Sequence, residues 1–169
     1  MRKELSKRNA SWQRYANVGG SAREDAVNKI LETYLMDNPN YVVTSKPRDL
    51  AHIYDGKWGI VPELGIRYIP TNKIAFLECK RQGNNGNAHE RLCKYLTPGI
   101  LSRSTPIAGF YNPFFFILMD GLAKDPKKRL EVSIWFDQDG FRDRYLLWED
   151  KEIKTLIAWF NSNIRRCLE

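Results

Sequence analysis

The chain has 169 residues, a formal net charge of +7 and a hydrophobic fraction of 43%, which together predict one folded domain and exclude an intrinsically disordered protein. Its three cysteines are widely spaced and no apolar run approaches about 20 residues, which excludes a disulfide framework, a CxxC zinc site and a membrane span. The first residues lack the apolar stretch of a signal peptide, so we expect a cytoplasmic protein without a membrane partner. The basic excess favours a polyanion such as nucleic acid as partner, with a solvated basic surface as the alternative.

The N-terminal part of the chain predicts a basic arm, a helix and a strand. Residues 1–23 hold six basic residues and one acidic residue, and we expect a basic N-terminal arm over residues 1–20. Residues 21–169 are expected to form the single domain. A helix is predicted over residues 21–36, where apolar residues recur at helical spacing, and a short strand over residues 41–44.

A β-hairpin is predicted in the middle of the chain, where residues 63–69 and 73–80 flank the turn sequence Pro70-Thr71-Asn72. The second strand is apolar on both faces, which is typical of a central strand. A polar loop over residues 83–86 and a helix over residues 88–96 are predicted to follow.

The C-terminal third predicts a buried strand over residues 114–120, a second hairpin with strands at residues 132–136 and 144–148, and a last helix over residues 149–165. The strands and amphipathic helices together predict an α/β fold, with a mixed central β-sheet flanked by helices.

Three polar side chains are expected to converge on the first hairpin. Side chains alternate between the two faces of a strand, so Glu78 and Lys80 share one face. If Ile69 pairs with Ile74 around the turn, Glu63 pairs with Lys80. The sequence therefore predicts Glu63, Glu78 and Lys80 on one face, at one end of the hairpin.

This set of side chains predicts metal-assisted hydrolysis of a phosphodiester. The carboxylates of Glu63 and Glu78 suit Mg²⁺, which prefers oxygen ligands, and Lys80 can orient a water and stabilise charge on a phosphate. Asp55 is a second candidate ligand, outside the hairpin. The alternative is a set of cross-strand ion pairs, each worth about 1 kcal/mol or less.

The spacing Pro62-Glu63, fourteen residues, then Glu78-Cys79-Lys80 resembles the PD-(D/E)xK nuclease signature. The sequence Gly86-Asn87-Ala88-His89-Glu90-Arg91 that follows is similar to the motif of type II restriction endonucleases of the EcoRI and MunI group, and more similar to its MunI branch. The resemblance extends from Trp12 to the C-terminal helix. It implies a restriction-endonuclease-like α/β core in which Glu63 and Glu78 ligate Mg²⁺ and Lys80 serves the attacking water.

One departure from the family concerns the first ligand, because the family has Asp where this chain has Glu63. The side chain is one methylene longer and still reaches a metal, but ligand placement tolerates little error. An alternative function is therefore a catalytically weak or inactive sequence-specific DNA-binding protein of nuclease descent. A third is a structure-specific nuclease such as a junction resolvase, which would cut branched DNA without sequence preference.

Residues 86–91 are expected to bind DNA, and the resemblance implies that they read AATT. An Asn suits the N6/N7 edge of adenine, an Ala packs against a thymine methyl, and Glu and Arg offer an acceptor and donors to base edges. Within the segment, Gly86 lets the backbone approach a groove closely, and His89 is a support or a phosphate contact. Asn87 and Glu90 also have the spacing of a helix N-cap box, a role that is compatible with base reading.

A second departure lies just before this segment. The MunI branch has a longer loop there, with an arginine that reads the outer base pair, whereas this chain has Asn85. A short amide cannot make the bidentate contact of an arginine with guanine. We therefore expect Asn85 to lie at the DNA without reading a C·G outer pair, so that the site is AATT alone or AATT with relaxed flanks.

The resemblance also implies the partners and products of the reaction. Double-stranded DNA with a palindromic site calls for a homodimer. Water would attack the phosphorus in line and leave a 5′-phosphate and a 3′-hydroxyl, and a cut before the first A of AATT would give a 5′ overhang. A cognate DNA methyltransferase would protect the host's own sites.

Overall fold

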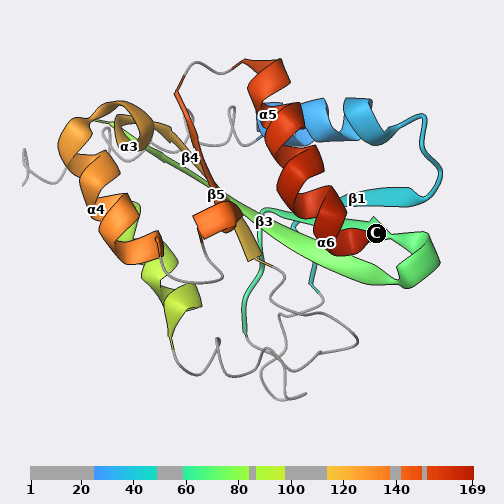
Figure 1. Ribbon diagram of the computed structural model, residues 1–169. Coiled ribbons are helices and arrows are strands. Elements are labelled where there is room, and N and C mark those ends of the chain that lie inside the picture. The colour runs from blue at the N-terminus through green and yellow to red at the C-terminus, as the bar shows by residue number, and fades with distance from the viewer. Residues whose placement is uncertain (1–24, 49–58, 84–86, 98–113, 138–141, 150–151) are drawn as a thin grey trace, which may run out of the picture.

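A computed structural model describes residues 25–48, 59–83, 87–97, 114–137, 142–149 and 152–169 (Figure 1). Its strands are β1 (Tyr41–Ser45), β2 (Leu64–Tyr68), β3 (Lys73–Gln82), β4 (Phe114–Asp120) and β5 (Tyr145–Trp148). They form one sheet in the order β1-β2-β3-β4-β5. The first three strands pair antiparallel, and β3, β4 and β5 pair parallel, so the sheet is mixed as predicted.

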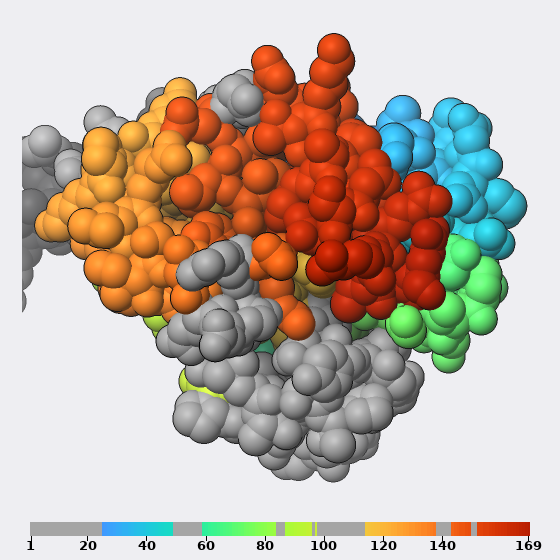
Figure 2. All heavy atoms as spheres, in the orientation of Figure 1, coloured from blue at the N-terminus to red at the C-terminus, as the bar shows by residue number. Residues whose placement is uncertain are grey.

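Helices cover both faces of this sheet, which confirms the predicted α/β architecture. One face packs against a helix over residues 25–35 and against a helical stretch made of α5 (Ile153–Trp159), the π-helix η5 (Phe160–Arg165) and α6 (Arg166–Leu168). The other face packs against η3 (Glu90–Leu96), α3 (Gly121–Lys124) and α4 (Pro126–Phe136). Figure 2 shows α4 in orange and the α5–α6 stretch in red over separate parts of the surface.

A hydrophobic core lies on each face. The first core, under the 25–35 helix and α5–α6, includes Leu31, Leu77, Ile117, Phe160 and Ile164. The second core, under η3, α3 and α4, includes Phe76, Leu92, Phe116, Val132 and Phe136. Strand β3 contributes alternate residues to the two cores, which confirms that it is the central, doubly covered strand.

The predicted register of the first hairpin is wrong by two positions. Tyr68 pairs with Lys73 and Leu64 with Leu77, so the loop starts one residue earlier than expected. The reason is the turn itself: a 3-10 turn, η2 (Ile69–Thr71), is closed by Asn72 in the left-handed conformation at φ 53° and ψ 21°. Because the shift is an even number of residues, every side chain keeps its predicted face.

The predicted second hairpin is also wrong, because residues 132–136 belong to α4. Asp125 caps this helix by accepting a hydrogen bond from Lys127 N at 2.9 Å, and Pro126 occupies its first position. Val132 and Phe136, four residues apart, are both buried in the second core. These helix signals outweigh the strand preference of the β-branched and aromatic side chains.

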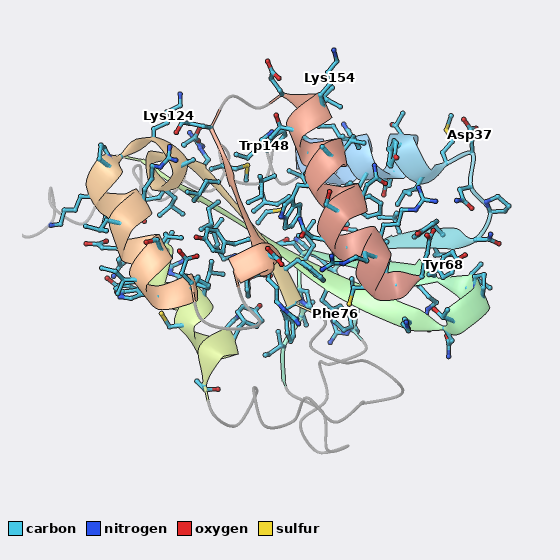
Figure 3. The ribbon with its side chains drawn as sticks, in the orientation of Figure 1. Asp37, Tyr68, Phe76, Lys124, Trp148 and Lys154 are labelled. Carbon is cyan, nitrogen blue, oxygen red and sulfur yellow. The ribbon has the colours of Figure 1, made fainter. Side chains whose placement is uncertain are left out.

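The remaining elements follow the predictions closely. The first and last helices fall within or near their expected ranges, and Trp148 at the end of β5 donates from Nε1 to Glu152 O at 3.0 Å beside the start of α5 (Figure 3). The helix expected at residues 88–96 is the 3-10 helix η3, over seven residues. Among the described residues, no helix is long and apolar enough to cross a membrane. The basic arm expected over residues 1–20 lies outside them.

Candidate active site

Glu78 is a buried carboxylate on the central strand. It is 4% exposed, on the face of β3 that also carries Phe76, which is labelled in Figure 3. Its Oε1 forms an ion pair with Lys80 Nζ at 2.8 Å, and its Oε2 accepts a hydrogen bond from the backbone N of Glu63 at 3.3 Å. A charge is tolerated in this position because each oxygen has a donor.

Glu63 lies one position beyond the Leu64–Leu77 pair, and so opposite Glu78. Its backbone is held on both sides, because its N–H donates to Glu78 and its carbonyl accepts from Lys46 N at 2.9 Å. Its side chain is half-buried, and no hydrogen bond or ion pair from another described residue holds its carboxylate. The corrected register therefore places Glu63 opposite Glu78, where the sequence had predicted a Glu63–Lys80 pair.

Lys80 is the half-exposed member of the cluster. Its side chain is 19% exposed, against 5% for the side chain of Glu78, and it lies nearer the C-terminal end of β3. The structure thus brings Glu63, Glu78 and Lys80 together on one face, as predicted. Asp55, the second candidate ligand, lies outside the described residues.

The donor set fits Mg²⁺ better than a metal that requires an all-protein cage. Within the described ranges, no group of three or more His, Cys, Asp or Glu side chains gathers at a metal-binding distance. Mg²⁺ takes one or two protein carboxylates and completes its coordination with water and substrate phosphate. Glu78, which is buried, and Glu63, which is half-buried and opposite it in register, could supply these one or two carboxylates.

Tyr95 is a residue near this cluster that sequence reasoning missed. Its side chain is 1% exposed in the second core, and its hydroxyl makes no hydrogen bond of normal geometry with any described residue. Burial raises the pKa of the Tyr95 phenol, and the carboxylates of Glu78 and Glu63 raise it further. In the sequence, Tyr95 is three residues from Leu92 on the apolar side of a helix, a pattern that indicates a core residue.

Gln82 links the end of β3 to the segment expected to bind DNA. Its side chain is buried, and Oε1 accepts a hydrogen bond from the backbone N of Ala88 at 2.5 Å. The same strand end is packed closely against α3, because a Cβ added at Gly121 would lie 2.7 Å from Gly83 O and 2.8 Å from Gln82 O. The segment therefore starts from a rigid point two residues beyond Lys80.

The exposed side chains of residues 87–91 are available for contact with another molecule. Asn87, Glu90 and Arg91 are exposed and Ala88 is half-buried. Asn87 Nδ2 donates to Glu90 Oε2 at 2.7 Å, so the two side chains bond to each other. The expected N-cap box is not formed, because His89 occupies the N-cap position without a side-chain cap.

The other two residues of the predicted DNA-binding set, Asn85 and Gly86, lie outside the described residues. Their assignment stays a prediction, as do the roles assigned to residues 87–91.

His89 is held from the side of α4. Its imidazole has no exposed surface, stacks on Trp135 with ring centroids 4.8 Å apart, and places Nε2 2.9 Å from Glu131 Oε2. Lys128 Nζ lies 2.8 Å from the same oxygen. Hydrogen bonds from Lys128 and then His89 lower the pKa of Glu131. Of the two roles predicted for His89, this geometry favours support over a phosphate contact.

Three comparisons with known proteins all find similarity to the type II restriction enzyme MunI. A family model described as type II restriction enzyme MunI matches residues 1–169. The type II restriction enzyme MunI of Mycoplasma sp is 28% identical over an alignment of 202 positions, which covers 98% of this chain and 98% of that protein. A crystal structure of MunI restriction endonuclease in complex with cognate DNA superposes with a TM-score of 0.66 and 26% identity, over 83% of this chain and 89% of that one.

Proposed function

Because the chain belongs to the family of the type II restriction enzyme MunI and is a site-specific endonuclease, we propose that it hydrolyses double-stranded DNA at a palindromic site containing AATT, in a Mg²⁺-dependent reaction. The observation that carries the proposal is the convergence of Glu63, Glu78 and Lys80 on one sheet face. The exposed side chains of residues 87–91 follow the same strand and supply the contact to bases.

Glu63 and Glu78 would hold the Mg²⁺, which when bound supplies a Lewis acid for the phosphate. Lys80 would orient the attacking water and stabilise the negative charge that develops on the phosphate, since its ammonium is already fixed by Glu78 at 2.8 Å. In-line attack on phosphorus breaks the bond to the 3′ oxygen and leaves a 5′-phosphate. A cut before the first A of AATT would leave a 5′ overhang.

The base-reading side chains are Asn87, Ala88, Glu90 and Arg91, with His89 as their support. The 2.7 Å hydrogen bond between Asn87 and Glu90 holds two of them in a fixed relation before DNA arrives, which lowers the entropy cost of binding. A homodimer would present this segment once to each half of the palindrome. A cognate methyltransferase would protect the host's own copies of the site.

The flanking specificity is the sharpest test of this proposal. DNA carrying AATT in all flanking contexts would be incubated with the enzyme and Mg²⁺, and the cut ends would be sequenced. We expect 5′-overhang ends at AATT with little dependence on the outer pair, because Asn85 stands where the MunI branch has arginine. Strict dependence on a C·G outer pair would contradict the proposed role of Asn85.

A second candidate function is sequence-specific DNA binding with weak or no cleavage, and the extra methylene of Glu63 favours it. Its half-buried carboxylate is not held by any described residue, so its position as a ligand is less fixed than that of Glu78. The variant Glu63→Asp separates the two functions. Binding of AATT without cleavage by both proteins would favour the binder, whereas cleavage by the wild type at least as fast as by Glu63→Asp would exclude it.

A further inference from the structure

The hydroxyl of Tyr95 is a buried polar group without a partner. Almost every buried hydroxyl in a protein has a hydrogen-bond partner, and one without a partner costs free energy. In the first core, Tyr41 obeys this rule by donating to Glu169 Oε1 at 2.8 Å. Tyr95 is 1% exposed and makes no hydrogen bond of normal geometry with a described residue, although the Glu78 carboxylate lies close enough to interact with its hydroxyl.

The ring of Tyr95 is fixed beside the strand pair that carries Glu78. It packs on Phe114 with ring centroids 4.6 Å apart and on Phe116 at 5.4 Å. Phe116 is the β4 residue that pairs with Glu78, and all of these residues share the second-core face of the sheet. The phenol is therefore held on the same face as the buried carboxylate, one strand away.

The hydroxyl of Tyr95 can act as a donor to a carboxylate. A tyrosine phenol has an ordinary pKa of about 10 and so keeps its proton at neutral pH. Glu78 still has acceptor capacity, because each carboxylate oxygen accepts two hydrogen bonds and the structure assigns one donor to each.

We propose that Tyr95 is a positioning residue for the metal ligand Glu78, and that it donates its O–H to this carboxylate when divalent metal and DNA are bound. This inference rests on the function proposed above. Ligating carboxylates are oriented by hydrogen bonds from residues behind them, and loss of such a partner weakens metal binding. The O–H of Tyr95 is the donor that the second core offers for this purpose.

The position of Tyr95 in the chain gives this contact a second consequence. Tyr95 lies on η3, which starts at Glu90 within the segment that reads DNA. The proposed hydrogen bond would therefore connect the helix that begins among the DNA-binding candidates to the metal ligand Glu78.

The test compares Tyr95→Phe with Tyr41→Phe, since each removes one buried hydroxyl and leaves its ring in place. Two responses would be measured: the Mg²⁺ concentration for half-maximal cleavage of AATT DNA, and the Ca²⁺ concentration that half-maximally tightens binding of the same uncleaved DNA. We expect Tyr95→Phe to raise both concentrations by about 10-fold. DNA affinity without divalent ions should stay unchanged, and Tyr41→Phe should change neither concentration.

A merely unsatisfied hydroxyl gives the opposite pattern. Its removal in Tyr95→Phe would raise the unfolding temperature and leave both metal responses at the wild-type values, which would overturn the inference. A double-mutant cycle adds a second measurement: in the Glu78→Gln background, adding Tyr95→Phe should give no further change in the Ca²⁺ response. An additive change there would also overturn the proposed contact.

The outcome for Tyr95 is separable from that for the proposed function. If the wild type binds AATT DNA in a Ca²⁺-dependent way but does not cleave it with Mg²⁺, the proposed cleavage fails while the Ca²⁺ comparison still decides the role of Tyr95. If the wild type shows no response to either cation, both fail. If the wild type cleaves and Tyr95→Phe matches it at every metal concentration, only the inference fails.

Discussion

The two faces of the sheet hold different kinds of buried residue. The first core, under the 25–35 helix and α5–α6, is built from hydrophobic side chains. On the second face, the same depth of burial is reached by Glu78, Gln82 and His89, which are the buried polar or charged residues among those described. The same strand, β3, supplies hydrophobic residues to one side and two of these three polar residues to the other.

The buried polar residues of the second face are explained by their partners. A buried polar group destabilises a protein unless it is paired. Glu78 pairs with Lys80, Gln82 with the backbone of Ala88, and the Nε2 atom of His89 with Glu131, whereas Nδ1 of His89 makes no hydrogen bond with a described residue. Two of these partners, Lys80 and Ala88, belong to the proposed metal site and the proposed DNA-binding segment. The second face thus combines a hydrophobic core with buried polar side chains that position the candidate site, whereas the buried core of the first face is hydrophobic.

The largest expected effect contrasts neighbouring residues on opposite faces. Lys80→Ala should reduce the cleavage rate by at least about 10²-fold, because it removes the cation that stabilises charge on the reacting phosphate. Binding of AATT DNA in Ca²⁺ should persist. Cleavage of plasmid DNA and gel-shift binding would measure the two effects.

The matched control is Cys79→Ala, one residue away on the first-core face, which should lower stability and keep the cleavage chemistry. The contrast between the faces would be broken if Lys80→Ala cleaved at the wild-type rate, or if Cys79→Ala abolished cleavage in a protein that was still folded.

A smaller effect is expected from Arg91→Ala, which removes an exposed hydrogen-bond donor from the proposed DNA-binding segment, residues 87–91. Loss of one bidentate base contact should reduce discrimination between AATT and single-base variants by about 1–3 kcal/mol. Relative cleavage of the cognate and variant sequences measures this discrimination. Lys154→Ala, which removes an exposed charge from α5 beside the first core, is the control for net charge. Unchanged discrimination in Arg91→Ala would show that Arg91 does not read bases.

The smallest expected effect is a pH dependence of the support beneath His89. Hydrogen bonds from Lys128 and His89 lower the pKa of Glu131 below its ordinary value of 4.5. Its carboxylate therefore stabilises the fold above pH 4.5, and this contribution is lost as the pH falls through the lower pKa of the folded state. Glu131→Gln should unfold at a slightly lower temperature than wild type at pH 7, with the difference vanishing at low pH.

Thermal unfolding of both proteins from pH 7 to pH 3 would measure how this difference in unfolding temperature declines. Glu32→Gln, which removes an exposed carboxylate from the 25–35 helix, is the matched variant on the opposite face. A Glu131→Gln curve that ran parallel to wild type across the whole range would contradict the assigned ion pair.

The sequence alone was sufficient to predict that Glu63, Glu78 and Lys80 share one face, but not how they are paired. Alternation along a strand placed Glu78 and Lys80 on one face, and the spacing to Glu63 placed the second carboxylate at the same end of the hairpin. The pairing of Glu63 was wrong because the register depends on the backbone conformation of Asn72, which residue type alone does not determine. That one turn decides whether Glu63 faces an ammonium or a carboxylate.

The residues that sequence reasoning missed are those whose role depends on distant neighbours. Trp135 and Glu131 support His89 from 42 to 46 positions further along the chain, on a helix that was predicted to be partly a strand. Tyr95 has the spacing of an ordinary core residue, and only the packing of its ring on Phe114 and Phe116 reveals its position beside Glu78. Contacts of this kind are set by tertiary packing, for which a local pattern holds no signal.

The close packing of α3 on the end of β3 has a consequence for engineering this enzyme. At Gly121 any side chain would collide with the backbone of Gln82 and Gly83, so a library at that position would return only glycine among functional clones. At Gly83 an added Cβ meets no atom within 4 Å, although the carbonyl group of this residue takes part in the same contact. A selection for new flanking preferences therefore has room for a side chain at position 83, two residues before Asn85 in the sequence, and none at position 121.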